Sequence, residues 1–121
     1  MTEKLFRFED PEIWRRAAAT SLRLFVLADD SEMRRQYRFA EQLRAATLSV
    51  TNNIAEGSGS TSDAEFAQFL NIARRSVYKV ANMLILLSKN NAFDPTDTQP
   101  ILWELEEQSR MIPAFIRRLR S

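Results

Sequence analysis

Apolar residues recur along this 121-residue chain at spacings of three and four, which is the period of an amphipathic α-helix. The pattern is most regular between residues 62 and 90. The apolar stripe of this segment consists of Phe66, Leu70, Ala73, Val77, Val80, Leu84 and Leu87. Its alternation of steps of four and three is the a/d pattern with which helices pack in a bundle. The sequence therefore predicts a helix over 62–90.

Two helices are predicted before this segment. Asp10 and Pro11 form a start signal, because Asp can cap free backbone amides and Pro fits the first helical position. The first helix is predicted over 11–28, where apolar residues follow the helical period. The polar residues 29–31 supply a break and a new cap, so the second helix is predicted over 32–56.

The fourth helix is predicted over 97–119 from the same spacing. Pro113 falls inside it, and because proline removes a backbone hydrogen bond we expect a kink or an early end there. Four helices joined by short connections predict an all-α fold, an antiparallel up-down-up-down four-helix bundle. We expect residues 1–121 to form a single domain, since the chain is close to the usual size of one.

The connection between the second and third helices contains both glycines of the chain. Gly57 is predicted to end the second helix in the left-handed conformation that glycine favours. Ser62 and Glu65 then stand at the spacing of a capping box at the start of the third helix. A Gly-Ser loop before a helix can bind phosphate, but Asp63 and Glu65 in the first turn would repel an anion. We expect no phosphate site here.

The apolar stripes of the third and fourth helices are wider than one bundle core needs. The additional apolar residues are Ile72, Met83, Ile85, Leu86, Trp103, Met111 and Phe115. They indicate either a thick core or a flank that is buried against identical subunits. A homo-oligomer is therefore one expectation.

Composition excludes several classes of chemistry. The chain has no Cys and no His, which removes disulfides, thiolate nucleophiles, Cys/His zinc sites and imidazole catalysis. We expect no enzymatic activity, no cofactor, no metal and no small-molecule substrate. No apolar signal segment is visible at the N-terminus, and the longest apolar stretch, 80–87, is too short to span a membrane. A cytoplasmic protein with no membrane partner is expected.

Basic residues are distributed unevenly, although the net charge is only +1. The first candidate nucleic-acid-binding group consists of Arg74, Arg75, Tyr78 and Lys79, in a segment without acids. The second consists of Arg117, Arg118 and Arg120. Other interpretations of both groups stay open. The first group would also fit a solvated face or pairs across a subunit interface, and the second would complement the dipole of the last helix.

Several short motifs point to one protein family. The strongest are Asn53-Ile-Ala-Glu56-Gly57, Glu65-Phe66, Phe69-Leu70-Asn71-Ile72-Ala73 and Ser76, with weaker ones at Gln42-Leu-Arg44, Leu48-Ser-Val50, Phe8-Glu-Asp10 and Ile13-Trp14. In these motifs the chain resembles the four-helix-bundle proteins encoded in intervening sequences of bacterial 23S rRNA genes. It departs from them at Ala45, where members often have a second Arg, and at Lys79, where many have Glu.

The resemblance carries expectations about assembly and partners. The same family includes the accessory variability determinant protein of diversity-generating retroelements. That protein is a basic, pentameric barrel of bundles that works with a reverse transcriptase and binds nucleic acid. For this chain the resemblance implies a pentamer and, as an alternative function, a nucleic-acid-binding accessory protein for RNA or DNA.

The motif residues are interpreted as structural rather than catalytic. Asn53 and Glu56 would satisfy polar groups at the end of the second helix or reach across to the third. The full set interpreted as structural is Asn53, Glu56, Gly57, Glu65, Phe66, Phe69, Leu70, Ala73 and Ser76. We therefore expect a non-enzymatic homo-oligomer, a pentamer if the resemblance holds, that acts as a scaffold or adaptor for a protein or nucleic-acid partner.

Overall fold

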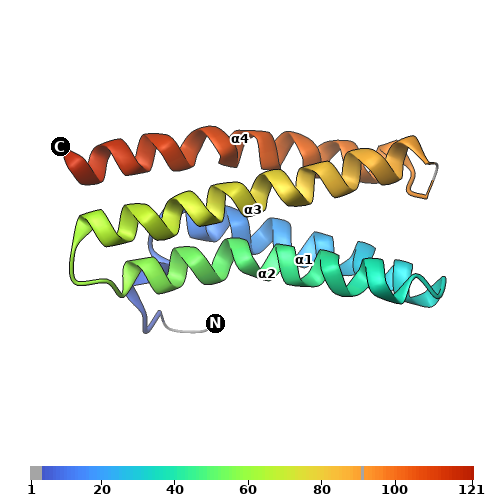
Figure 1. Cartoon of the computed structure of the whole chain (residues 1–121), viewed down its shortest axis with the longest axis horizontal. Helices are drawn as coiled ribbons and strands as arrows, with labels where there is room; N and C mark the ends of the chain where they lie inside the picture. Colours follow the sequence, from blue (N-terminus) through green and yellow to red (C-terminus); the bar gives the residue numbers. More distant parts are fainter. Residues whose placement is uncertain (1–3, 91) are drawn as a thin grey trace.

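The computed structural model describes residues 4–90 and 92–121, and within them it contains helices and no strand. The elements are a short 3-10 helix η1 (Arg7–Glu9), α1 (Glu12–Met33), α2 (Tyr37–Ser58), α3 (Asp63–Lys89) and α4 (Pro95–Arg120). Figure 1 shows the four α-helices side by side. The α1–α2 and α3–α4 connections lie at one end, and the α2–α3 connection lies at the other (Figure 1). The prediction of an all-α chain with four helices is confirmed.

Helix α1 ends five residues later than predicted, because residues 29–31 continue the helix instead of breaking it. The turn comes at Arg35, whose φ of 66° is left-handed. There the Arg35 N–H donates to the Glu32 carbonyl (2.9 Å) and the Gln36 N–H donates to the Ser31 carbonyl (2.9 Å). These two bonds are those of a Schellman motif, which usually has glycine at the left-handed position. Because arginine stands there instead of glycine, the sequence gives no signal for this turn. The predicted start of the second helix at residue 32 is therefore wrong.

The predicted role of Gly57 is also wrong. Gly57 lies inside α2 and is not left-handed, and the helix ends one residue later. What requires glycine is the close approach of α3. A Cβ on Gly57 would lie 2.7 Å from Cδ1 of Phe66 and 2.7 Å from Cβ of Phe69. Gly57 therefore lets α2 and α3 pack together at the point where the chain turns between them.

One of the two predicted helix caps is present, and α4 begins two residues before its predicted start. The hydroxyl of Ser62 accepts a hydrogen bond from the Glu65 N–H (3.2 Å) and caps α3 as expected. The Asp94 carboxylate accepts from the Thr96 N–H (2.9 Å) and caps α4. Asp10 does not cap α1, whose start has no side-chain cap, because the helix begins one residue beyond the predicted position.

Helix α4 continues through Pro113 to its end at Arg120, so the expected early end is wrong. Proline cannot donate to the carbonyl four residues earlier, which belongs to Ser109. That carbonyl instead accepts a hydrogen bond from the Nε of Arg74 on α3 (2.9 Å). A side chain from the neighbouring helix thus replaces the missing backbone donor.

The core runs along the centre of the bundle. Helix α1 packs against α2, α2 against α3, α3 against α4, and α4 back against α1. The predicted stripe of α3 is confirmed as core: its residues are buried, except that Leu87 is half-buried against the others. Because the helices follow this cyclic order, the edge formed by α1 and α2 lies opposite the edge formed by α3 and α4.

The additional apolar residues divide into two groups. Met83, Met111 and Phe115 are half-buried and pack against the core, which agrees with the interpretation of a thick core. Ile72, Ile85, Leu86 and Trp103 are exposed, and for them the other interpretation, a flank buried against identical subunits, stays a prediction. In the described part of the chain no helix is both long and apolar enough to cross a membrane.

Candidate functional site

The polar motif residues join α2 to α3 through a chain of hydrogen bonds. The Asn53 amide nitrogen donates to the Ser49 carbonyl (2.7 Å) and lies 3.0 Å from the Ser49 hydroxyl. That hydroxyl lies 2.7 Å from the hydroxyl of Ser76, which also donates to the Ile72 carbonyl (3.1 Å). These side chains are half-buried. Only the contact between Ser49 and Ser76 crosses from α2 to α3, because the other bonds each stay within one helix. The structural interpretation of Asn53 and Ser76 stays a prediction.

The apolar motif residues fill the space beside Gly57. Phe66 is buried, and its ring packs edge-on against Phe115 of α4 at a centroid distance of 5.6 Å. Leu70 and Ala73 are fully buried, and Phe69 is half-buried. The two motif carboxylates, on Glu56 and Glu65, are exposed instead. The arrangement does not bring them together as an acid and a base at one site.

The motif residues therefore lie on both sides of the contact between α2 and α3. They also lie together in the part of the chain that matches one protein family. A family model described as 23S rRNA-intervening sequence protein matches residues 9–114. The chain belongs to this family. The predicted resemblance is confirmed, whereas the link to the retroelement accessory proteins stays a prediction. No curated protein matches the chain.

In this member of the 23S rRNA-intervening sequence protein family, Arg74 is engaged within the fold. Besides its bond to the Ser109 carbonyl, its Nη2 donates to the Tyr78 hydroxyl (3.1 Å). Its guanidinium carbon also lies 5.0 Å from the centre of the Tyr78 ring, at cation–π distance. Two of the four residues in the first basic group therefore contact each other. Arg75 and Lys79 are exposed, and neither forms a salt bridge within the described residues.

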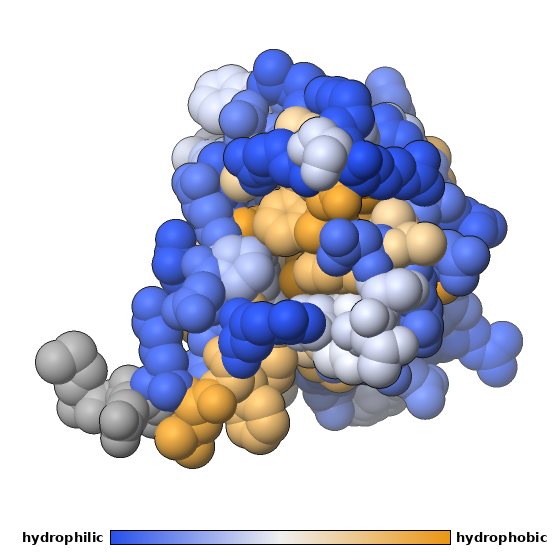
Figure 2. All heavy atoms as spheres, turned by 90° about the vertical axis from the view of Figure 1, so that its left-hand side faces the viewer, coloured by the Kyte–Doolittle hydropathy of each residue, from blue (hydrophilic) through white to orange (hydrophobic). Residues whose placement is uncertain are grey.

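The second basic group lies at the end of the bundle where α2 joins α3, far from the middle of α3 (Figure 1). The Arg118 guanidinium carbon lies 5.5 Å from the ring centre of Phe115, and Arg117 and Arg120 are exposed. Figure 2 looks at this end and shows apolar side chains in the middle, surrounded by hydrophilic ones. A groove at this end is lined by two acidic residues, Asp10 and Asp63, and by none of the three arginines of the second basic group. The structure does not bring the two basic groups into one surface.

The contact between α1 and α4 contains a polar network that the sequence analysis did not predict. Arg16 binds the Glu104 carboxylate through two nitrogens, at 2.7 and 2.9 Å. Gln108 is buried and donates to the Thr20 hydroxyl (2.9 Å). The hydrogen bonds from Arg16 lower the pKa of Glu104, and the same carboxylate raises the pKa of Arg16. The only sequence signal was the four-residue spacing within each pair, Arg16 with Thr20 and Glu104 with Gln108.

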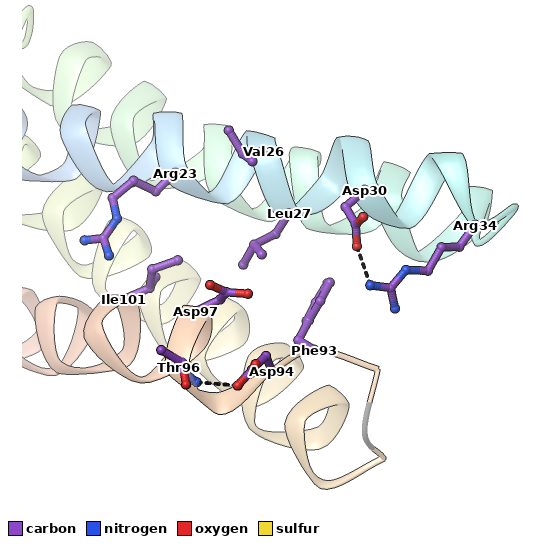
Figure 3. Close-up of a pocket in the computed structure, with 10 residues that line it drawn as sticks. All are labelled: Arg23, Val26, Leu27, Asp30, Arg34, Phe93, Asp94, Thr96, Asp97 and Ile101. Carbon is purple, nitrogen blue, oxygen red and sulfur yellow. Dashed lines mark hydrogen bonds and ion pairs between the residues drawn. The ribbon is translucent and has the colours of Figure 1, made fainter.

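A groove of about 550 Å³ lies between α1 and the start of α4. Figure 3 shows Asp30 and Arg34 turned toward each other, and the Asp94 carboxylate at the Thr96 N–H. Arg34 bonds to Asp30 (2.8 Å) and to the Ala92 carbonyl (2.6 Å). These polar groups hold the α3–α4 connection against α1. Among residues 4–90 and 92–121, no group of three or more acidic side chains is placed to hold a metal ion.

Two apolar surfaces lie on opposite edges of the bundle. The α1/α2 face is a groove lined by Ala18, Leu22, Phe25, Leu48, Asn52 and Ala55. The α3/α4 face is a groove lined by Tyr78, Asn82, Ile85, Gln99, Leu102 and Trp103. Leu22 is 68% exposed on the first face, and Trp103 is 67% exposed on the second. The sequence identified Ile85 and Trp103 as part of an additional apolar flank. It gave no corresponding prediction of an apolar surface on α1 and α2.

Proposed function

We propose that this protein is the non-enzymatic subunit of a homo-oligomer, a pentamer, that acts as a cytoplasmic scaffold or adaptor. The observation that carries the proposal is the pair of apolar faces on opposite edges of the bundle. The alternating connections in Figure 1 support an antiparallel up-down-up-down order of the helices, which gives each subunit two long edges for contact. The motif residues support a structural rather than a catalytic role, since Ser76 contacts Ser49 across α2 and α3 and Phe66 packs against Phe115 of α4.

Exposed apolar area gives the physical reason for assembly. Covering apolar surface is worth about 25 cal/mol per Å², and large exposed apolar patches typically mark interfaces. Tyr78 is 55% exposed and Trp103 67% exposed on the same face. Aromatic residues of this kind are enriched among the side chains that dominate interface energetics. Association with further copies removes them from water without any change of the fold.

Light scattering over a range of protein concentrations tests the proposal. We expect a mass five times that of the 14.0 kDa subunit. Trp103→Glu should shift the protein to smaller species, because it places a charge in the contact. Met33→Glu is the matched control, since Met33 is exposed, apolar and outside both faces. A monomeric wild-type protein at every concentration would contradict the proposal.

The second candidate function is nucleic-acid binding as an accessory protein, with a reverse transcriptase among the candidate partners. The observation that favours it is the charge of α3. This helix has no acidic residue after position 65, and its Arg75 and Lys79 side chains are exposed. Arg74 is held by Ser109 within the fold, so we assign contacts with phosphate first to Arg75 and Lys79.

A titration with structured RNA and duplex DNA at about 50 and 200 mM salt tests this candidate. Contacts with phosphate make affinity fall steeply as salt rises. The double variant Arg75→Glu, Lys79→Glu should abolish such binding and leave the oligomer intact. The double variant Arg15→Glu, Arg23→Glu, at two exposed positions on α1, is the control for total charge. Equal affinities of the double variant and the control would rule out this site.

A further inference from the structure

The contact between α1 and α4 contains one charge spacing twice. Arg23 follows Arg16 by seven residues on α1, and Asp97 precedes Glu104 by seven residues on α4. Arg16 binds Glu104, and further along α1 the Arg34 side chain reaches the α3–α4 connection, so higher numbers on α1 face lower numbers on α4. Seven residues are close to two helical turns. Arg23 and Asp97 therefore stand in the same register as Arg16 and Glu104, about two turns further along.

Only the first of these two pairs is a salt bridge. The Arg16 Nε lies 2.7 Å from the Glu104 carboxylate. Neither Arg23 nor Asp97 belongs to a salt bridge among the residues that the structure describes. The side chain of aspartate is one methylene shorter than that of glutamate, so its carboxylate reaches less far toward α1. The result is a cation and an anion that line the same groove without pairing.

An apolar floor separates these two charges. In the view of Figure 3, the Ile101 side chain lies between the Arg23 guanidinium and the Asp97 carboxylate. Ile101 is 3% exposed and Leu27 is 9% exposed, and both line this groove of about 550 Å³. The Arg23 and Asp97 side chains are exposed. A small molecule that lies on the floor can therefore reach both charges.

The other charged groups that line this groove already have partners. Asp30 and Arg34 bind each other at 2.8 Å, and the Asp94 carboxylate accepts a hydrogen bond from a backbone N–H in the first turn of α4 (2.9 Å). Arg23 and Asp97 remain as one positive and one negative group. A ligand that fits them carries one charge of each sign with an apolar segment between them.

We propose that this groove binds a linear ω-amino acid, a zwitterion with its ammonium and carboxylate groups at opposite ends of a short methylene chain. Its carboxylate accepts hydrogen bonds from the Arg23 guanidinium, whose planar fork fits a carboxylate. Its ammonium group donates to the Asp97 carboxylate, and its methylene chain covers Ile101 and Leu27. An α-amino acid carries both charges on one carbon and cannot span the floor. This site does not depend on the assembly proposed above.

A titration followed by NMR tests the site, with the methyl signals of Leu27 and Ile101 as reporters. The probes are glycine, β-alanine, γ-aminobutyrate, δ-aminovalerate and ε-aminocaproate. We expect saturable shifts whose affinity rises along this series until the chain spans the gap. Caproate and hexylamine, which each lack one of the two charges, should bind about tenfold more weakly than ε-aminocaproate or worse, because one charge-assisted hydrogen bond is missing.

Two sources of this ligand chemistry are compared in the same titration. A lysine at the C-terminus of a peptide also carries an ammonium and a carboxylate at the two ends of a methylene chain. Nα-acetyl-lysine reproduces that end of a peptide, whereas ε-aminocaproate represents a free ω-amino acid. The tighter of the two identifies the source, and either order supports the zwitterion site.

Matched variants remove one charge at a time. Arg23→Gln and Asp97→Asn should each weaken the binding of ε-aminocaproate by about tenfold or more. Arg15→Gln and Asp63→Asn remove the same charges at exposed positions elsewhere and should leave the affinity unchanged. Circular dichroism confirms that all four variants are folded.

Three results would overturn the proposal. The first is the absence of saturable shifts with every ω-amino acid of the series. The second is equal affinity for ε-aminocaproate, caproate and hexylamine, or equal affinity of the Arg23→Gln and Asp97→Asn variants and their controls. The third comes from urea denaturation without ligand, in which additive effects of Arg23→Gln and Asp97→Asn are expected. Effects that are not additive would show that the two side chains pair directly and leave no place for the ligand.

Discussion

The hydrogen bond from Arg74 to the Ser109 carbonyl should contribute to the free energy of unfolding only because residue 113 is proline. Ser109 is 9% exposed, so little water is available to its carbonyl if Arg74 is removed. We consider Arg74→Met, which keeps the unbranched aliphatic stem and removes the guanidinium, and Pro113→Ala, which restores a backbone N–H four residues beyond Ser109. The two single variants and the double variant form a thermodynamic cycle.

The size of the effect follows from the geometry. A buried polar group left without a partner costs about 1–3 kcal/mol, so Arg74→Met should lower the free energy of unfolding by roughly that amount. In the Pro113→Ala background the restored backbone N–H can donate to the Ser109 carbonyl, as in an ordinary helix. The cost of Arg74→Met should then fall by about 1–2 kcal/mol. The contact with Tyr78 is lost in both backgrounds and cancels in the cycle.

Urea denaturation, followed by helical circular dichroism at one fixed protein concentration, gives the four free energies of unfolding. Arg74→Met should be clearly more destabilising in the wild-type background than in the Pro113→Ala background, where only the loss of the Tyr78 contact remains. Equal costs in the two backgrounds, with a coupling energy below about 0.5 kcal/mol, would refute the link between Arg74 and Pro113.

Three further predictions concern stability and use denaturation as the assay. Gly57→Ala should destabilise the protein by about 1–3 kcal/mol, because its Cβ would meet Phe66 and Phe69 at 2.7 Å. Gly59→Ala is the control and should be nearly neutral, because its nearest neighbour would lie at 3.4 Å. Equal effects of the two substitutions would contradict the role of Gly57 in the close approach of α3. Arg35→Gly should stabilise by up to about 1 kcal/mol, since glycine adopts the left-handed conformation without steric cost; a loss of stability would refute this. The pKa of Glu104 is lowered by Arg16, so its stabilisation is complete above the ordinary carboxyl pKa of about 4.3 and is lost as the pH falls through the lower folded value. Between about pH 7 and pH 3 the wild-type protein should therefore lose more stability than Glu104→Gln, and parallel losses would show that the pair contributes nothing to acid sensitivity.

The sequence by itself determined the helices and their inward faces. The three-four spacing gave the α3 stripe, because a residue every three or four positions on a helix faces one side whatever the rest of the chain does. The cap at Ser62 was equally local, since a hydroxyl three residues before an amide needs no tertiary contact. The family motif was readable for the same reason, as a run of residue types at fixed spacing.

Tertiary structure decided the features that depend on a neighbouring helix. Gly57 was interpreted as a helix end because that is the usual local reason for glycine, whereas the actual reason is the approach of Phe66 and Phe69 from α3. Arg74 was interpreted as a surface residue, whereas Pro113, 39 positions away, exposes the carbonyl that it binds. The two opposite apolar faces likewise exist only once four helices are arranged around one core. Local patterns specify which side of each helix is apolar, and packing alone specifies which of those sides is left open.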